Sequence, residues 1–458
     1  MTDWSPETLT HLSREELIAL VSQLTAEVQR LQAEVARLQK PPTTSQNSSQ
    51  PPSRDQKRSV TRTRRAHHCG AKPGHAKAER PWVAQPDTVI EARVSHCAAC
   101  GTDLRTAPPQ KVIRRQLVEL PVIRPLVIET QQHELVCPHC QGVQRGTLPA
   151  GLEATRHFGP RLEATVVYLQ HQQHLSYERT QAALGELFGV SLSEGGQACM
   201  LERAGAAAQP AAETIRTQVV ASPVVGSDET GARVQGRTWW QWVFVGASAI
   251  YHVIRPSRGE DVIQEVLGEH RIPTWVCDCW APQLRAPAEQ FQLCLAHQIR
   301  NLQSLIERCP HLRWAGELQA LFRTAIHLAN RRLQLTVRGF TRRVGELERQ
   351  LDRLLRRQVR SPAAQPLVKR YRKHRQHLFV FLHDPQVPAH NNACERALRP
   401  SVIHRKVTGG FRSQWGADAY AALATVLDTA KLRGQPVFET LVQLMGQPVL
   451  PYVSSRIS

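Results

Sequence analysis

Two extended segments that each end in an aspartate constrain the fold of this 458-residue chain more than any other feature. Residues 223–234 are predicted to form a strand around Asp228, followed by strands at 238–245 and 250–255 that tight turns connect. A short helix at 260–267 leads to a buried strand that ends at Asp278. We expect an antiparallel meander whose fourth strand runs parallel to its first.

That strand order places Asp228 and Asp278 at adjacent strand ends, as at the start of a ribonuclease-H-like sheet. Neighbouring carboxylates repel each other unless a cation bridges them, and Mg²⁺ prefers oxygen ligands. The best candidate for a third carboxylate is Glu395, in a predicted helix at 391–400 that begins with an asparagine cap. Glu229 is a rival ligand, although strand alternation directs its side chain to the opposite face.

Two Cys-x-x-Cys turns indicate a second kind of metal site. Two such turns, each beside a glycine and separated by one small sheet, are typical of a four-thiolate structural Zn²⁺ site. We expect this site in a β-rich module at 82–150 that contains the short apolar runs 112–113 and 117–118. The four predicted ligands are Cys97, Cys100, Cys137 and Cys140. The alternative ligands are Cys69, His96 and His139.

A leucine repeat marks the N-terminal segment. Leucines recur every seven residues from Leu17 to Leu38, with valines from Val21 to Val35 between them. Valine and leucine at alternating three-four spacing favour a parallel coiled-coil dimer over residues 1–40, with a capping box at Ser13. The alternative is a single amphipathic helix that packs on its own domain. Residues 41–81, rich in proline and then in arginine, are predicted to be a disordered or extended basic linker.

Two further segments are predicted to be helical. Residues 151–215 resemble a helix-turn-helix, with a turn at Gly189 and a new helix at Ser191; an ordinary helical pair is the alternative. Residues 300–385 form a helical insertion whose apolar seam, from Leu333 to Leu354, indicates one arm of a helical hairpin. Its remaining faces carry arginines that suit DNA phosphates or form a solvated basic surface: Arg331, Arg332, Arg342, Arg343, Arg353, Arg356 and Arg357.

Charge and cysteine usage narrow the class of protein. The formal net charge is +19, from 58 lysines and arginines against 39 acids, which points to a polyanionic partner. No segment resembles a signal peptide, and no apolar run approaches the roughly 20 residues that a membrane span needs. Eleven scattered cysteines favour a reduced, cytosolic protein with metal sites over a disulfide framework.

The chain resembles the transposases of the insertion sequence IS66 family over nearly its whole length, in domain order and in local motifs. The matching motifs are Ser227–Thr230, Cys277–Trp280, Cys294–His297, Asn391–Arg396 and Ile403–Gly410. One position departs from the family, because His390 stands where an aspartate often precedes the paired asparagines. That difference leaves the role of the position open.

The resemblance implies a multidomain α+β or α/β protein with a ribonuclease-H-like catalytic domain at 216–440 and a C-terminal tail at 441–458. By that likeness Asp228, Asp278 and Glu395 take the catalytic roles, holding Mg²⁺ or Mn²⁺. His297, Asn392 and Arg396 are expected to support them; the alternative for His297 is a hydrogen bond in the core. The implied function is a DNA transposase that acts on terminal inverted repeats and target DNA. A homodimer or higher oligomer, accessory proteins from the same element, and a place on the bacterial nucleoid in the cytoplasm are also expected.

Two other functions are alternatives to DNA transposition. A metal-dependent nuclease or junction resolvase on the same fold would cut DNA without strand transfer. A non-catalytic or domesticated zinc-dependent DNA-binding protein would only bind it.

Overall fold

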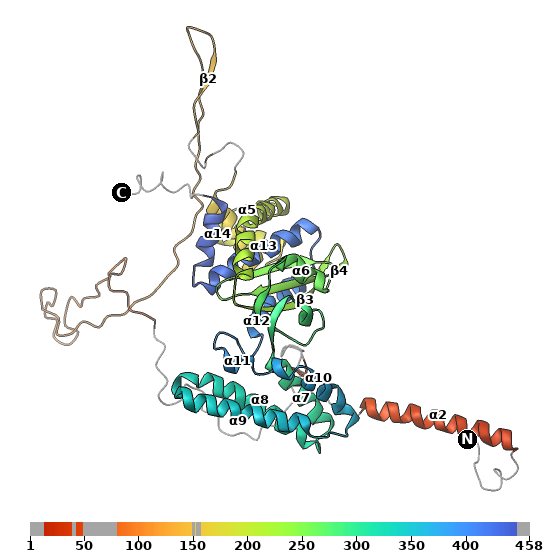
Figure 1. Cartoon of the computed structure of the whole chain (residues 1–458). Helices are drawn as coiled ribbons and strands as arrows, with labels where there is room; N and C mark the ends of the chain where they lie inside the picture. Colours follow the sequence, from red (N-terminus) through yellow and green to blue (C-terminus); the bar gives the residue numbers. More distant parts are fainter. Residues whose placement is uncertain (1–12, 39–42, 49–79, 149–151, 153–156, 447–458) are drawn as a thin grey trace. The chain divides into compact units, whose positions relative to one another are not determined.

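The computed structural model of the chain describes residues 13–38, 43–48, 80–148, 152 and 157–446 (Figure 1). The chain divides into two compact units, residues 57–126 and the remainder. The expectations for residues 1–12, for most of the linker at 41–81 and for Cys69 lie outside the described residues. Within the described ranges, no helix combines the length and the apolar character that crossing a membrane requires.

A five-stranded mixed sheet organises the larger unit. Its spatial order is β5 (Ile250–Arg255), β4 (Arg237–Val245), β3 (Val224–Val234), β6 (Ile272–Cys277) and β7 (Ala288–Leu293). The β3–β4–β5 meander is antiparallel and β6 runs parallel to β3, as expected from the sequence. The turn at Gln235–Gly236 has φ of 51° and 75°, the left-handed geometry that suits a two-residue hairpin. Strand β7, parallel to β6, was not expected.

Helices cover the faces and one edge of this sheet. Helix α6 (Glu260–Leu267) connects β5 to β6, and the 3₁₀ turn η3 (Gln283–Arg285) lies between β6 and β7. Helix α13 (Gln414–Leu432) packs on edge strand β5 and on α5 (Glu194–Val220). The hydroxyls of Thr429 and Thr425 accept hydrogen bonds of 3.0 and 2.9 Å from the amides of Ile250 and His252. Because α13 satisfies these edge amides, β5 does not offer them to a further strand.

The expected helical insertion is present. It comprises the helices α7 (Leu295–Arg308), α8 (Arg313–Asn330), α9 (Val337–Arg356), α10 (Gln365–Lys373) and α11 (Val380–His383), with short 3₁₀ turns η4 (Arg332–Gln334), η5 (Pro362–Ala364) and η6 (Arg375–His377). Helices α8 and α9 lie side by side (Figure 1). The seam residues from Phe340 to Leu354 are buried, but Leu333 and Val337 are 99% and 83% exposed. The apolar seam therefore begins later than predicted, because Leu333 lies in a 3₁₀ turn that precedes the helix.

The helical insertion leaves and rejoins the sheet at one point. The amide of Leu295, where the insertion begins, donates to the carbonyl of Ala389, where it ends, at 2.9 Å. The Asn391 amide contacts Cys294 Sγ at 3.1 Å. Since both ends are held together, the insertion extends from the sheet without separating α12 (Asn392–Thr408) from it.

The helix-turn-helix-like segment contains α3 (Pro160–Val167), a π-helical turn η2 (Tyr168–Gln172), α4 (Tyr177–Phe188) and the start of α5. Gly189 ends α4 with a φ of 66°, as the predicted turn requires. Helix α5 begins at Glu194 rather than at Ser191, because Leu192 is buried in the local core and Ser193 caps the helix by accepting from Gly196 N at 3.1 Å.

Two predicted boundaries fall inside helices. Helix α5 continues from the helical segment to Val220, so the boundary at 215/216 does not separate two folded pieces. Helix α14 (Val437–Met445) crosses the boundary at 440/441 and packs on α3 and α5. Its buried Leu441, Val442 and Met445 show that the chain is still part of the packed domain at these positions, so the predicted boundary at 440/441 is wrong.

The N-terminal segment forms a single long helix, α2 (Arg14–Leu38), that starts directly after Ser13. Its seam residues Leu17, Val21, Leu24, Val28 and Leu31 are between 38% and 61% exposed. Residues 43–48 and 80–81 are the described parts of the expected linker. There, Asn47 donates a hydrogen bond to Glu307 of α7 and is 7% exposed.

The region expected to be β-rich contains less strand than predicted. A hairpin of β1 (Glu134–Val136) and β2 (Val143–Arg145) carries the second Cys-x-x-Cys turn. The first turn lies in the unit 57–126, whose described residues contain one isolated bridge, between His96 and Asp103, and no longer strand. The runs at 112–113 and 117–118 are exposed and form no strand, because residues 80–126 offer them no apolar layer to pack against.

Candidate active site at the end of the central strands

Both aspartates lie just beyond the last residue pair that joins the central strands β3 and β6. The last β3–β6 pair joins Gly226 to Val276, so Asp228 and Asp278 each lie two residues beyond it in parallel strands. Asp278 directly follows β6, whereas Asp228 lies inside β3, which continues to Val234 against β4, so the predicted strand end at Asp228 is wrong. The two aspartates nevertheless occupy equivalent positions beyond the last β3–β6 pair. Burial, and then the nearby carboxylates of Glu229 and Asp278, raise the pKa of Asp228 to about 8, with a smaller contribution from Glu395.

Helix α12 brings Glu395 to the same edge through a close contact with β3. A side chain at Gly226 would place its Cβ 2.9 Å from Asn391 Oδ1 and 3.0 Å from Cys394 Sγ, so only glycine lets α12 approach this closely. Asn391 Nδ2 donates to the carbonyl of Ser227 at 2.6 Å. Asn391 occupies the cap position but makes no capping hydrogen bond, because its side chain reaches β3 instead.

Two side chains of α7 contact the Glu395 carboxylate. Arg300 Nη2 lies 2.9 Å and His297 Nε2 3.6 Å from Glu395 Oε1. Burial, followed by the charge of Arg300, lowers the pKa of His297, which favours its neutral form. The buried Nδ1 of His297 has no hydrogen-bond partner in the described part of the chain. Arg300 was not among the predicted site residues, although its position three residues after His297 places both on one helix face.

The other two predicted supporting residues, Asn392 and Arg396, make no described contact with the three acids. Asn392 is the first residue of α12 and is half-buried, whereas Arg396 is exposed on the same helix. The asparagine that joins α12 to β3 is Asn391, which the sequence suggested only as a helix cap.

The rival acid Glu229 has its own partners. Its side chain is 2% exposed and lies 2.9 Å from the Arg258 guanidinium and 3.0 Å from Gln283 Nε2. These contacts occupy both carboxylate oxygens. Glu229 is therefore a poorer candidate metal ligand than Asp228.

Asp228, Asp278 and Glu395 are close enough to influence one another electrostatically. Their carboxylates do not, however, converge on a common point as the ligands of one metal ion would. Among the described residues, no group of three or more His, Cys, Asp or Glu side chains is positioned to hold a metal ion. Asp278 Oδ1 accepts from the amide of Trp280 at 2.8 Å, and Glu395 is directed towards Arg300.

Both Cys-x-x-Cys turns fold as tight loops. The Gly101 amide donates to Cys97 O at 2.9 Å, and the Gln141 amide donates to Cys137 O at 2.8 Å. Hydrogen bonds with Thr102 lower the pKa of the Cys100 thiol to about 7, and backbone amides lower that of Cys137. Both shifts favour the thiolate form that zinc binds. The two turns belong to different units of the chain, so the four-cysteine site stays a prediction.

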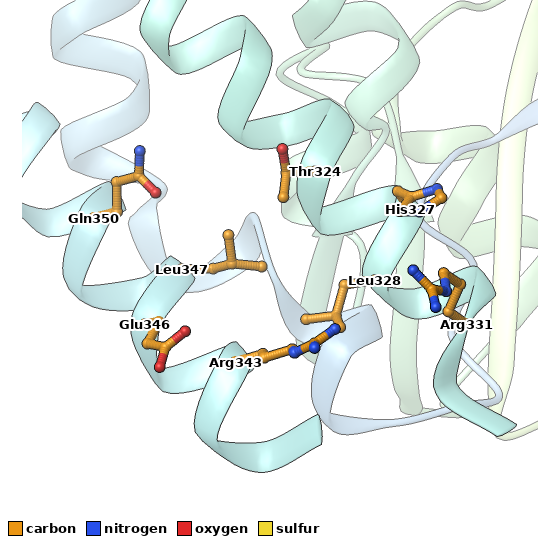
Figure 2. A pocket seen from close by; sticks show the side chains of 8 residues that line it. All are labelled: Thr324, His327, Leu328, Arg331, Arg343, Glu346, Leu347 and Gln350. Atoms are coloured by element: carbon orange, nitrogen blue, oxygen red, sulfur yellow. The ribbon is translucent and has the colours of Figure 1, made fainter. Parts of the chain in front are cut away.

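Candidate DNA-binding surfaces differ in charge. On α9, Arg343, Arg353 and Arg356 are exposed and make no ion pair within the described residues, whereas Arg332 donates to the carbonyls of Phe381 and Leu382. A cavity of about 260 Å³ between α8 and α9 is lined by Arg331 and Arg343, and none of the three acids reaches it (Figure 2).

The helix-turn-helix-like segment exposes more acid than base. Glu178, Glu186, Glu194 and Glu202 are exposed there, and Arg203 is paired with the buried Glu163. Electrostatic attraction of DNA therefore favours the helical insertion over this segment.

Comparison with known proteins gives the wider context of this site. The chain is 25% identical over 407 residues to the uncharacterized protein y4hP of Sinorhizobium fredii, covering 77% of this chain and 71% of that protein. Residues 156–419, which contain the three acids, the insertion and most of the sheet-covering helices, match the family model described as "Transposase IS66 family". Because this match covers more than half of the sequence, the chain belongs to the IS66 family of transposases.

Proposed function

We propose that the protein is a DNA transposase of the acidic-triad type, with Asp228, Asp278 and Glu395 as its catalytic carboxylates on a ribonuclease-H-like domain. The observation that carries the proposal is the proximity of the three acids: Asp228 and Asp278 lie two residues beyond the last β3–β6 pair, and the close contact of α12 with β3 brings Glu395 to the same place. Burial and the neighbouring carboxylates also raise the pKa of Asp228, to about 8. A partly buried acid beside other acids is costly to ionise without a cation, and hard divalent cations prefer such oxygen ligands.

Mg²⁺ or Mn²⁺ held by these acids would supply an activated oxygen nucleophile and stabilise the leaving oxygen of a phosphodiester. Glu395 would have to exchange its contact with Arg300 to join the other two acids. Arg300 would then be released beside the site, where its planar guanidinium suits a DNA phosphate. Neutral His297 would remain a hydrogen-bonding neighbour of the same phosphate, and exposed Arg396 would add positive charge. Asn392 and Asn391 would hold the start of α12 in place.

The remaining parts of the chain fit DNA transposition. We infer a structural zinc ion at Cys97, Cys100, Cys137 and Cys140, because each Cys-x-x-Cys turn is closed by a backbone hydrogen bond and the pKa values of the Cys100 and Cys137 thiols are lowered, as suits zinc ligands. The exposed seam of α2 fits a parallel coiled coil between two copies, which would bring two element ends together. The net charge of +19 fits binding to element ends and target DNA on the nucleoid in the bacterial cytoplasm, with accessory proteins of the same element as further partners.

The decisive experiment is strand transfer by the purified full chain with Mg²⁺ or Mn²⁺ and the DNA that flanks its gene. Asp228→Asn is expected to reduce product formation by at least about 1,000-fold while leaving binding to the element ends intact, since only the chemical step needs the carboxylate. Normal strand transfer by that variant would show that Asp228 is not a catalytic residue. Cleavage without strand transfer by the wild-type protein would identify a nuclease instead, and binding without cleavage a regulator.

A further inference from the structure

An exposed tryptophan lies next to the candidate active site. Trp280 follows Asp278 by two residues and is 39% exposed. Its backbone amide donates a hydrogen bond to Asp278 Oδ1 at 2.8 Å, which holds the backbone of Trp280 close to that carboxylate. Trp280 therefore presents accessible aromatic surface directly beside one of the proposed catalytic acids.

The indole ring of Trp280 is supported from within the protein. The guanidinium carbon of Arg258 lies 4.3 Å from the ring centroid of Trp280 and 4.5 Å from that of Trp240. Cation–π contacts on two rings hold the guanidinium group between them. The Arg258 charge is balanced by Glu229, whose side chain is 2% exposed and 2.9 Å away.

Buried polar contacts fix this arrangement further. Gln283, which is 1% exposed, donates to Glu229 Oε2 at 3.0 Å and accepts from the indole of Trp275 at 3.1 Å. Trp280 is therefore the outermost member of a built stack rather than a loose surface side chain. The stack also accounts for Glu229, the acid that the proposed chemistry does not use.

We propose that Trp280 is a binding site for an unpaired nucleobase of the DNA strand adjacent to the phosphate that is cut. The proposal rests on the proposed function, because Asp278 locates the scissile phosphate. A base that has left the duplex exposes an aromatic face, and stacking on tryptophan is favourable for all four bases. Since Arg258 already covers part of the ring and is neutralised by Glu229, the accessible surface of Trp280 offers stacking rather than a free positive charge.

The test compares the affinity of the full-length protein for two DNA probes, without divalent metal. Both are duplexes from an end of its own element; one is fully paired and the other has a single unpaired base beside the cleavage point, scanned over neighbouring positions. We expect the wild-type protein to bind the best unpaired probe about 5- to 100-fold more tightly than the paired probe, as base–aromatic stacking implies. A 2-aminopurine at that position should be quenched on binding.

Trp280→Ala is expected to abolish this preference and the quenching, whereas Trp280→Phe should retain a reduced preference because a ring remains. Trp415→Ala is the matched control, since Trp415 is similarly exposed, at 42%, and belongs to α13. Retention of the full preference by folded Trp280→Ala, or no preference in the wild-type protein, would overturn the proposal. Asp228→Asn should keep the preference, so the failure of stacking and the failure of the catalytic assignment give different results.

Discussion

Asp228 illustrates at the scale of one residue how its neighbours set the protonation state of an acid. Its pKa is raised to about 8, while an unfolded aspartate ionises near about 4. The folded protein therefore holds a proton that the unfolded chain has lost between these two values. The stability that this proton contributes is present at low pH and is lost as pH rises from about 4 to about 8.

Asp228→Asn removes this pH dependence, because an amide does not ionise. In the absence of divalent metal, we expect the melting temperature of Asp228→Asn relative to wild type to increase from pH 5 to pH 8. Excess Mg²⁺ should narrow the gap at pH 8 by stabilising only the wild-type protein. Thermal melts at four pH values measure this, with the exposed Asp87→Asn as the control. A difference between Asp228→Asn and wild type that does not change with pH would contradict the raised pKa.

Gly226 shows how a single residue decides the position of Glu395. Gly226→Ala would place a methyl group 2.9 Å from Asn391 Oδ1 and 3.0 Å from Cys394 Sγ, so these side chains, or α12 with them, must shift. We expect a loss of about 1–3 kcal/mol in the free energy of unfolding, as for other overpacked sites. Strand transfer should fall at the same time. Urea denaturation measures the first effect.

The matched control is Gly316→Ala in α8, where an added Cβ meets no atom within 4 Å. Alanine should stabilise that helix by up to about 1 kcal/mol. Equal effects of the two substitutions would show that the contact between β3 and α12 is unimportant.

At the scale of elements, the geometry of the two Cys-x-x-Cys turns predicts that the protein binds zinc, which can be measured. Each turn is closed by its own backbone hydrogen bonds, so each places two thiols together without help from the other. A shared Zn²⁺ would join the turns and stabilise the residues around them.

The replacement of Cys97 or Cys137 by serine tests this site. We expect the purified wild-type protein to contain about one zinc ion per chain and each variant to contain much less, since three thiolates bind Zn²⁺ less well than four. Binding to element ends should weaken as well. Cys199→Ser is the control, because Cys199 is an exposed cysteine on α5. Wild-type protein without zinc, or variants with undiminished zinc, would refute the four-cysteine site.

At the scale of the whole molecule, α2 is a long helix whose apolar seam is not buried within the chain. Its seam residues are exposed in a single chain, and most helical stability comes from burying such a face. Deletion of residues 1–40 is therefore expected to convert dimers to monomers, as light scattering at micromolar concentration would show. Leu24→Glu should act in the same direction, whereas Gln29→Glu, at a position outside the seam, should not. A dimer that survives the deletion would place the main interface elsewhere.

The sequence alone determined the first four strands of the sheet and their order, but neither strand β7 nor the lack of strands at 112–118. Short apolar runs and the turn residues between them, from 223 to 278, predicted the meander and the parallel fourth strand, and hence the neighbouring positions of Asp228 and Asp278. The meander depends on contacts between residues close in sequence, which patterns and turn residues record directly. The hairpin of α8 and α9 was predictable for the same reason. The parallel fourth strand follows from the helix that precedes it, because a crossover helix returns the chain to the sheet in the direction of an earlier strand.

Only the tertiary structure decided how Glu395 reaches the sheet, because 117 residues separate it from Asp278 and no periodicity relates the two. The Leu295–Ala389 hydrogen bond, the close contact at Gly226 and the Asn391 side chain together bring α12 to β3. The pairing of Arg300 with Glu395 and the stack of Trp240, Arg258 and Trp280 arise in the same way. Each joins side chains from distant segments, and the physical cause is packing between elements, which a single sequence does not encode as a repeating pattern.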